Sequence, residues 1–247
     1  MNYKPFFLDT ETTGTENKDR LTQVAYSYAP VSKANSTVEL FKPPVPITVA
    51  SMAVTHITNK MVADKEPFQS SSIYDALKTE LEKPETIMVA HNARFDIDML
   101  EREGLSVPRH IDTLRVARYL DPQGKIESYR LQNLRYLLDL DADITETVQA
   151  HDAFGDIVVL EKLFDRLFAK MQKQMDGADE TAVLDEMMAI SLRPSLIHSF
   201  NFGKHMGKTI ADVAGEDRGY LEWLLKQKKE NPTDEEDWIF TLEKYLT

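Results

Sequence analysis

Residues 4–11 read KPFFLDTE, an apolar run that ends in two acids. This pattern predicts a buried strand with a polar end. Because side chains alternate along a strand, Asp9 and Glu11 point to the same face as Phe7. Two neighbouring carboxylates beside apolar surface are costly, and neither has a basic neighbour in the strand. A bound cation would relieve this cost, although a solvated strand end or a distant arginine would also explain the pair.

The sequence on either side of this strand predicts further strands and helices. Apolar runs favour strands, and apolar stripes at helical spacing favour helices. We expect strands at residues 21–28, 36–42 and 87–90, and helices at residues 72–82, 93–103, 113–120, 130–138 and 153–170. Strands that come first and then alternate with helices predict an α/β sandwich with a mixed sheet.

The last third of the chain has a different character. Residues 172–181, QKQMDGADET, are polar and contain glycine, as linkers do. A short helix is expected at 181–191, and Thr233 with Glu236 forms a capping box that predicts a last helix. We therefore divide the chain into residues 1–171, a linker with a short helix at 172–192, and a small α+β module at 193–247.

Composition limits the classes of protein that fit. The 247 residues carry a formal net charge of −12 and include no cysteine, which excludes disulfides and thiolate metal sites. Apolar runs are far shorter than the roughly 20 residues of a membrane-spanning helix, and the first residues lack a secretory apolar stretch. We expect a cytoplasmic protein with no membrane partner. The charge argues against a passive polyanion binder, but bound divalent cations would let an acidic protein process nucleic acid.

A third acid is predicted to face inward from a helix. Residues 91–100 read HNARFDIDML, and Met99 and Leu100 mark the apolar stripe of the helix. A step of four residues back along this stripe reaches Asp96, which therefore faces the core. Asp98 lies on the opposite side, where a solvated charge is the expected interpretation.

The helix expected at 153–170 places a fourth acid inward. Its stripe of Leu160, Leu163 and Phe164 extends back through Asp156. A favourable interaction with the helix dipole would explain an acid in the first turn, but not its inward direction. His151 lies in the loop before this helix. A lone loop histidine is usually a surface residue, but beside inward acids it is a candidate base, with an ordinary pKa near 6.5.

Inward acids thus come from three separate elements. Oxygen ligands without cysteine favour Mg²⁺ or Mn²⁺ over zinc. Such a cluster suits two-metal chemistry on phosphodiesters.

Three segments, in order, resemble the three motifs of the DEDD superfamily of 3′–5′ exonucleases. They are FFLDTETTG (6–14), HNARFDIDML (91–100) and HDAFGD (151–156). The spacing H-x-A-x-x-D in the last segment is similar to that of the histidine branch, because the tyrosine branch would need Tyr where Asp152 stands. Two further segments support the resemblance. Residues 52–58, MAVTHIT, resemble a loop of the group but lack its Gly, and residues 193–225 resemble the C-terminal module of one exodeoxyribonuclease group in the superfamily.

The resemblance implies a ribonuclease H-like fold, with a five-stranded mixed sheet flanked by helices. It also implies that residues 1–171 hydrolyse the terminal phosphodiester at a DNA 3′ end and release nucleoside monophosphates, in repair or recombination. Two Mg²⁺ ions, for which Mn²⁺ can substitute, are the implied cofactors. Asp9 would bridge both ions, Glu11 and Asp156 would hold the ion that activates water, Asp96 would support the other through water, and His151 would take the proton.

The substrate is expected to be the 3′ end of DNA, with single strands favoured. The backbone at Thr10 and Thr12 is expected to approach the terminal nucleotide, while Asn92 would either orient the acids or cap its helix. Thr15 stands where the group often has a Leu that contacts the terminal base.

The C-terminal module is interpreted as an accessory element that binds substrate or a protein partner. Residues 193–210 hold three basic residues and no acid, so Lys204 and Lys208 are candidate phosphate ligands. Phe200 and Phe202 are expected to pack in a small hairpin on Trp223 and to leave both lysines free.

Three alternatives stay open at this point. The chain could be a proofreading-type polymerase subunit or an exoribonuclease of the same superfamily. It could also be a catalytically inactive nucleic-acid-binding protein, although all five motif residues are present.

Overall fold

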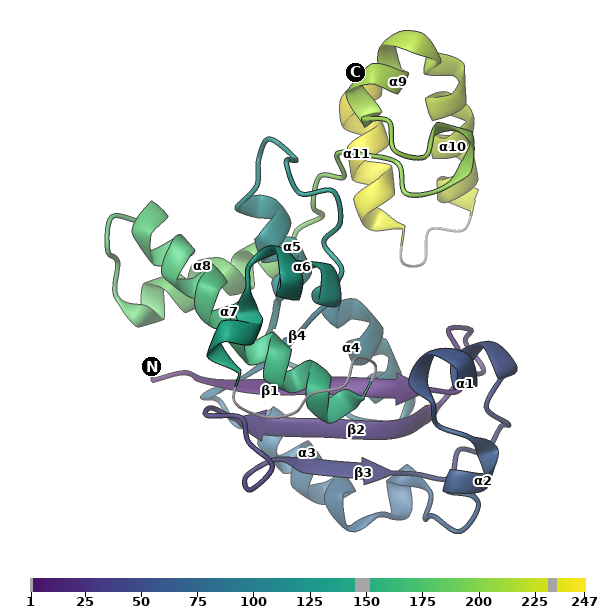
Figure 1. Ribbon diagram of the computed structural model, residues 1–247, viewed down its shortest axis with the longest axis vertical. Coiled ribbons are helices and arrows are strands. Elements are labelled where there is room, and N and C mark those ends of the chain that lie inside the picture. The colour runs from purple at the N-terminus through teal and green to yellow at the C-terminus, as the bar shows by residue number, and fades with distance from the viewer. Residues whose placement is uncertain (1, 145–151, 231–234) are drawn as a thin grey trace.

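The structure is a computed structural model that describes residues 2–144, 152–230 and 235–247. A five-stranded mixed sheet in the order β3-β2-β1-β4-β5 forms its centre (Figure 1). β1 runs antiparallel to β2 and parallel to β4; β2 and β3 are antiparallel, and β4 and β5 are parallel. The strands are β1 (Lys4–Thr12), β2 (Leu21–Tyr28), β3 (Thr37–Leu40), β4 (Thr86–Ala90) and β5 (His110–Asp112). The expected mixed sheet of five strands is confirmed.

Side-chain alternation along β1 builds a core on each face of the sheet. Phe7 packs into one core with α5 (Thr113–Tyr119), α6 (Leu131–Leu137) and α7 (Ala153–Gln174). Phe6 and Leu8 pack into the other core with α3 (Ser72–Glu82) and α4 (Ala93–Arg102). Asp9 and Glu11 share the alternation of Phe7, so they lie on the α7 face of the sheet.

Two short helices, α1 (Val49–Thr55) and α2 (Asn59–Val62), follow β3 and lie near the carboxyl end of β1 (Figure 1). The structure contains one strand that was not predicted from the sequence, β5. This strand has three residues and leads directly into α5, whose first turn Asp112 caps by accepting from the Leu114 N–H at 2.9 Å. A run this short carries too little alternation to be recognised as a strand.

The helix expected inside the linker belongs to the sheet domain. α7 continues to Gln174, and α8 (Glu180–Ser191) buries Val183, Leu184, Met187 and Ile190 in the core beside α7. Ser191 also accepts a hydrogen bond from the Asp112 N–H at 2.8 Å through its hydroxyl. The segment without helix or strand between the sheet domain and the module therefore begins at Leu192.

The C-terminal module is mainly helical in the part that the structure describes. It contains α9 (Ile210–Glu216), α10 (Arg218–Glu230) and α11 (Glu236–Leu246), around a core that includes Phe200 and Leu242. Its β component is one antiparallel bridge between Ser199 and Thr209. Phe200 stacks on Trp238 with ring centroids 5.4 Å apart, so the expectation of packing on Trp223, which is 54% exposed, is wrong. Thr233 of the expected capping box lies outside the described residues.

Ion pairs fasten the module to the sheet domain. Arg115 of α5 pairs with Glu236 at the start of α11, and Arg118 Nη1 lies 2.6 Å from Asp237 Oδ2. The same carboxylate accepts from the Ser195 hydroxyl at 2.8 Å. Among the described helices, none combines the length and the apolar character needed to cross a membrane.

Candidate active site

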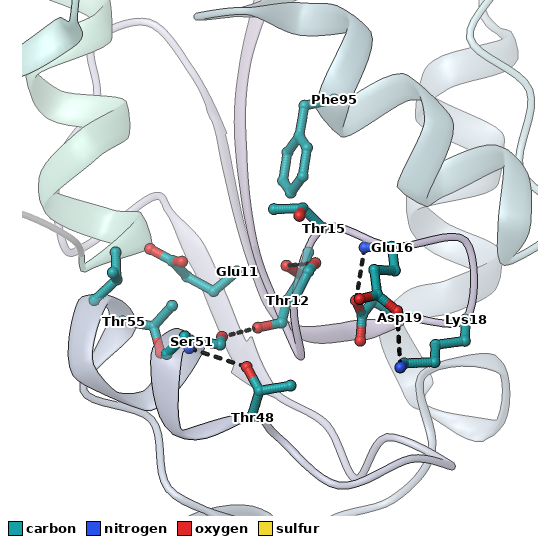
Figure 2. A pocket seen from close by; sticks show the side chains of 13 residues that line it. Glu11, Thr12, Thr15, Glu16, Lys18, Asp19, Thr48, Ser51, Thr55 and Phe95 are labelled. Carbon is teal, nitrogen blue, oxygen red and sulfur yellow. Dashed lines mark hydrogen bonds and ion pairs between the residues drawn. The ribbon is translucent and has the colours of Figure 1, made fainter. Parts of the chain in front are cut away.

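A cavity of about 490 Å³ opens at the carboxyl end of β1 (Figure 2). Glu11 forms one side, while Thr15 and Phe95 form another, and α1 contributes Ser51 and Val54. The Ser51 hydroxyl donates to the Thr12 carbonyl, which ties α1 to the strand end. The cavity thus combines a carboxylate with hydroxyl and apolar side chains.

A tight turn forms the rim of this cavity. Asp19 accepts from the Thr13 hydroxyl and from the Glu16 N–H, both at 2.7 Å. Gly14 is required beside it, because a Cβ there would lie 2.5 Å from Asp19 Oδ2. Thr15 lines the cavity in the place where a leucine was expected from the resemblance.

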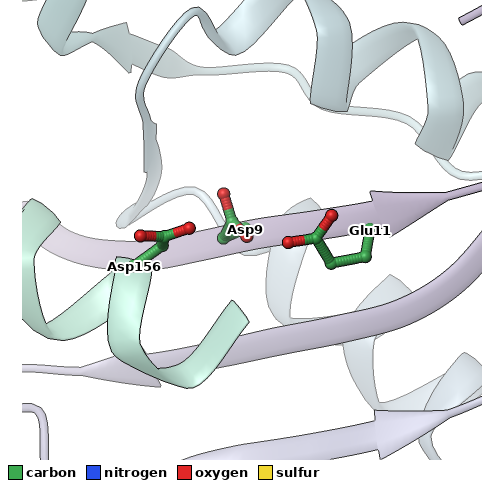
Figure 3. A group of neighbouring side chains, drawn as sticks. All are labelled: Asp9, Glu11 and Asp156. Atoms are coloured by element: carbon green, nitrogen blue, oxygen red, sulfur yellow. The ribbon is translucent and has the colours of Figure 1, made fainter. Parts of the chain in front are cut away.

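Three carboxylates meet where β1 approaches the first turn of α7 (Figure 3). One carboxylate oxygen from each of Asp9, Glu11 and Asp156 lies within 4.8 Å of the others. The first two side chains come from one face of β1, and the third comes from the inward face of α7. This spacing allows one small cation to contact all three residues.

Asp96 lies next to this cluster, at the start of α4. It is 4% exposed, and its Oδ1 accepts from the Thr10 hydroxyl at 2.7 Å. Its charge contributes to the raised pKa of both Asp9 and Glu11. Asp98 instead forms an ion pair with Arg94 at 2.8 Å on the outer side of the helix. The predicted inward position of Asp96 is confirmed. The expectation of a solvated charge at Asp98 is wrong, because its side chain is only 15% exposed and is paired with Arg94.

The protonation of these acids reflects burial and mutual repulsion. Burial, followed by the charges of Asp156 and Asp96, raises the pKa of Glu11 to about 8. The same causes raise the pKa of Asp9 well above its usual range. Burial raises the pKa of Asp96 to about 7, against the hydrogen bond from Thr10. A cation at the cluster would stabilise the charged forms that burial and mutual repulsion disfavour.

A residue that the sequence reasoning missed also belongs to this site. Gln132 of α6 donates from Nε2 to Asp156 Oδ1 at 2.7 Å and so orients one acid. Nothing in the sequence links positions 132 and 156, because the contact depends on how α6 packs against α7. Asp152 adds a further negative charge that acts on Asp9 and Glu11.

The other predicted residues near the acids have varied surroundings. His151 lies outside the described residues. Thr10 and Thr12 are both buried, and Thr12 donates its hydroxyl to the Gly14 carbonyl at 2.7 Å.

Asn92 starts α4 with φ 64°, but its side chain makes no capping hydrogen bond. Its backbone N–H donates to Asp112 Oδ1 at 3.0 Å. Asn92 is thus the N-cap residue of α4 by position, as one of the two interpretations expected, although its side chain does not make the capping hydrogen bond.

The two lysines of the module are paired rather than free. Lys204 Nζ lies 2.7 Å from Asp217 Oδ2, and Lys208 Nζ lies 2.5 Å from Glu216 Oε2. The expectation of unpaired lysines is wrong, because Glu216 at the end of α9 and Asp217 directly after it lie beside the turns that carry the lysines. Their contact with substrate stays a prediction.

Two family models match the chain. The model described as Exonuclease matches residues 6–164, and the model described as Exodeoxyribonuclease X-like C-terminal matches residues 200–229.

Curated relatives of the chain point in the same direction. Exodeoxyribonuclease 10 of Escherichia coli strain K12 is 33% identical over 220 residues, which cover 88% of this chain and 89% of the relative. DNA polymerase III subunit epsilon of Treponema pallidum is 31% identical over 178 residues, or 67% of this chain and 77% of the relative.

Solved structures share the fold. A structure of Exonuclease X in complex with 5′ overhanging duplex DNA has a TM-score of 0.56 and 26% identity, and covers 76% of this chain and 99% of that one. E. coli Exonuclease I in complex with a dA16 oligonucleotide has a TM-score of 0.51 and 22% identity, and covers 72% of this chain and 46% of that one. The second likeness concerns the fold alone.

Proposed function

The chain belongs to the exonuclease family, and from this premise we propose that it is a DNA exonuclease that releases nucleoside monophosphates from 3′ ends with two divalent metal ions. The observation that carries the proposal is the cluster of Asp9, Glu11 and Asp156 beside a cavity of nucleotide-binding size. An exonuclease needs hard cations next to a pocket for one terminal nucleotide, and these two features are adjacent at Glu11.

The donor set fits Mg²⁺ or Mn²⁺. All the donors are carboxylate oxygens, and the charges that raise the pKa of Asp9 and Glu11 come from other carboxylates. Asp9 would contact both ions, Glu11 and Asp156 would complete one site, and Asp96 would support the other through water. When bound, the ions would activate the attacking water and stabilise the charge that develops on the leaving 3′ oxygen.

The residues of this chain would then position the substrate and move the proton. The cavity between Glu11 and Phe95 would hold the terminal nucleoside, with the backbone at Thr10 and Thr12 beside it. Gln132 would hold Asp156, and the Thr10 hydroxyl would hold Asp96, in the orientation that ligation requires. His151 is assigned from the sequence as the base that takes a proton from the attacking water.

DNA is favoured as the substrate by the similarity that spans both parts of the chain. Exodeoxyribonuclease 10 covers 88% of the chain, and the second family model lies within the module. A proofreading subunit is less well supported, because the epsilon relative covers only 67% of the chain. The exoribonuclease alternative is tested by comparing hydrolysis of DNA and RNA strands. A role in repair or recombination follows as the accompanying proposal.

Hydrolysis of labelled strands tests the function. The protein is incubated with 5′-labelled DNA and RNA single strands of one sequence, with Mg²⁺, with Mn²⁺ and with EDTA. We expect a ladder that shortens from the 3′ end of DNA, weaker cleavage of RNA and no cleavage in EDTA. Asp9→Asn should abolish the ladder. Cleavage that persists in EDTA, or label that is released first as a mononucleotide, would contradict the proposal.

A further inference from the structure

We infer that the cleft between the sheet domain and the C-terminal module binds the single-stranded segment upstream of the reacting 3′ nucleotide. This inference rests on the proposed function and extends it to a second substrate site. The cleft has a volume of about 360 Å³. Its walls include Asn92, Tyr129 and Arg130 from the sheet domain, and His198, Asn201 and Trp238 from the module.

The cleft is continuous with the cavity at the acid cluster. Thr15 and Phe95 line both that cavity and a smaller hollow over α4. Asn92 lines both this hollow and the cleft. The three hollows therefore adjoin one another over the start of α4, which is the direction in which a strand would leave the cavity beside Glu11 toward the cleft.

The walls of the cleft are held in place before any substrate arrives. His91 is fixed between the Thr113 hydroxyl at 2.9 Å and the Tyr129 carbonyl at 2.7 Å. Arg118 is held by Asp237 at 2.6 Å. The connection that carries Arg130 packs tightly on the module, because a Cβ at Gly124 would lie 2.2 Å from His198 Cγ. A rigid groove binds a flexible strand at a lower entropic cost than a mobile one.

The chemistry of the cleft suits a polynucleotide backbone. Arg130 is exposed, and its guanidinium has no ion pair with any residue that the structure describes. Arg118 and Glu127 are the other lining residues with formal charges, and Arg118 is already paired with Asp237. Glu127 brings an exposed negative charge to the same wall, so the attraction for phosphate is local to the unpaired guanidinium of Arg130 and is not a property of the whole cleft. Tyr129 and Trp238 add aromatic surface, a combination that single-strand-binding grooves use.

Dependence on substrate length tests the inference. The full chain and Arg130→Ala are assayed on the p-nitrophenyl ester of thymidine 5′-monophosphate, which has no upstream strand, and on oligodeoxynucleotides from a dinucleotide to a long single strand. We expect Arg130→Ala to match the parent on the ester and to lose about 10-fold in kcat/KM on the long strand. The salt dependence of strand binding should fall by about 0.7 in log–log slope, the value for one phosphate contact on a single strand.

Lys125→Ala is the matched control. Lys125 lies in the same connection and carries the same charge, but it does not line the cleft. The control should match the parent on every substrate. A second pair of variants tests the wall that the module contributes. Asn201→Asp places a negative charge in the cleft and should weaken the binding of long strands only. Ala211→Asp adds the same charge on α9, away from the cleft lining, and serves as its control.

The outcomes separate this inference from the proposed function. A parent that hydrolyses neither the ester nor any DNA would contradict the function itself. If the parent is active, equal activity of Arg130→Ala at every length would overturn the cleft assignment, as would an equal loss on the ester. Both proteins are also assayed on a duplex with a 5′ overhang. A loss confined to that substrate would assign the cleft to the complementary strand and overturn the assignment to the upstream strand.

Discussion

Asp96 and Asp98 are two residues apart on α4 but have opposite environments. Asp96 is buried and accepts from Thr10, whereas Asp98 forms an ion pair with Arg94 on the outer side of the helix. We expect Asp96→Asn to lower kcat by about 10- to 100-fold, the usual cost of losing a group that supports a metal ligand set. Asp98→Asn should change kcat less than about 2-fold on a dinucleotide, since Asp98 pairs with Arg94 and is not part of the acid cluster. Single-turnover hydrolysis of a labelled strand measures both.

A large loss in Asp98→Asn together with normal turnover in Asp96→Asn would contradict this assignment. Circular dichroism of both variants provides the control for folding. Thermal unfolding then separates a catalytic loss from a loss of structure.

The raised pKa of Glu11 predicts a pH-dependent stability of the metal-free protein. Folding raises this pKa to about 8, so between roughly pH 4.3, the unfolded value, and pH 8 the folded state holds a proton that the unfolded state releases. The free energy of unfolding must therefore fall as the pH rises through this window. We expect the Tm in EDTA to decrease from pH 5 to pH 8. The free energy of unfolding should fall by on the order of 1 kcal/mol for each pH unit in this window.

Divalent metal should reverse the trend, because it binds the ionised carboxylates of the folded state. Glu11→Gln should weaken the pH dependence in EDTA without abolishing it, since the uncharged side chain does not titrate while Asp9 and Asp96 still do. A Tm profile that is the same in Glu11→Gln and the parent would show that this carboxylate does not carry the effect. Thermal unfolding at each pH, with EDTA and with Mn²⁺, provides all four curves.

Helical periodicity was sufficient to predict which acids face inward. The stripes of two helices led back to Asp96 and Asp156, and both side chains are buried. Periodicity could not reveal Gln132 as the partner of Asp156, because that contact joins α6 to α7 across the tertiary structure. It also could not reveal the acids that pair with Lys204 and Lys208, which approach through the fold of the module.

At the scale of elements, the contact between α5 and α11 determines how the module sits. Asp237 accepts from Arg118 at 2.6 Å and from the Ser195 N–H at 2.8 Å. We expect Asp237→Asn to lower the free energy of unfolding by about 2 kcal/mol, because it weakens charge-assisted hydrogen bonds and leaves Arg118 without its carboxylate. Urea denaturation measures the loss, and limited proteolysis near Leu192 reports loosening of the module.

Glu222→Gln is the matched control within the same module. Glu222 forms an exposed ion pair with Arg218 at 3.3 Å, so its loss should cost less than about 0.5 kcal/mol. Equal losses of unfolding free energy in the two variants would mean that the α5–α11 contact stabilises the protein no more than an exposed ion pair does. Faster proteolysis in Asp237→Asn alone would support its role in docking.

Elements with a regular apolar pattern were predicted well, including the short α5 and α6, whereas the three-residue strand β5 was not. The apolar stripe of α7 and the apolar run of β1 gave bounds within a few residues of those observed. β5 has only three residues, and the β component of the module reduces to one bridge, so neither shows enough alternation for an accurate prediction. α8 was expected as a helix, but its packing on the sheet domain depends on the fold as a whole.

At the scale of the whole molecule, the division of the chain decides which part functions alone. A chain ending at Leu192 keeps α8 and its buried contacts beside α7. A chain ending at Met171 loses α8 and also Ser191, which holds both Asp112 and Arg115 through hydrogen bonds at 2.8 Å. Removal of several buried apolar side chains costs about 2–5 kcal/mol for each, so the shorter piece should lack a stable fold.

The two truncations therefore give opposite expectations. The chain ending at Leu192 should unfold cooperatively and hydrolyse the nitrophenyl ester as fast as the full chain, because the acid cluster and its cavity lie entirely within it. It should lose the advantage that the full chain shows on long strands, since one wall of the cleft is gone. Thermal unfolding and kcat/KM on both substrates measure this. A stable, active chain ending at Met171 would contradict the packing role of α8, and full activity on long strands without the module would contradict the cleft as a substrate site.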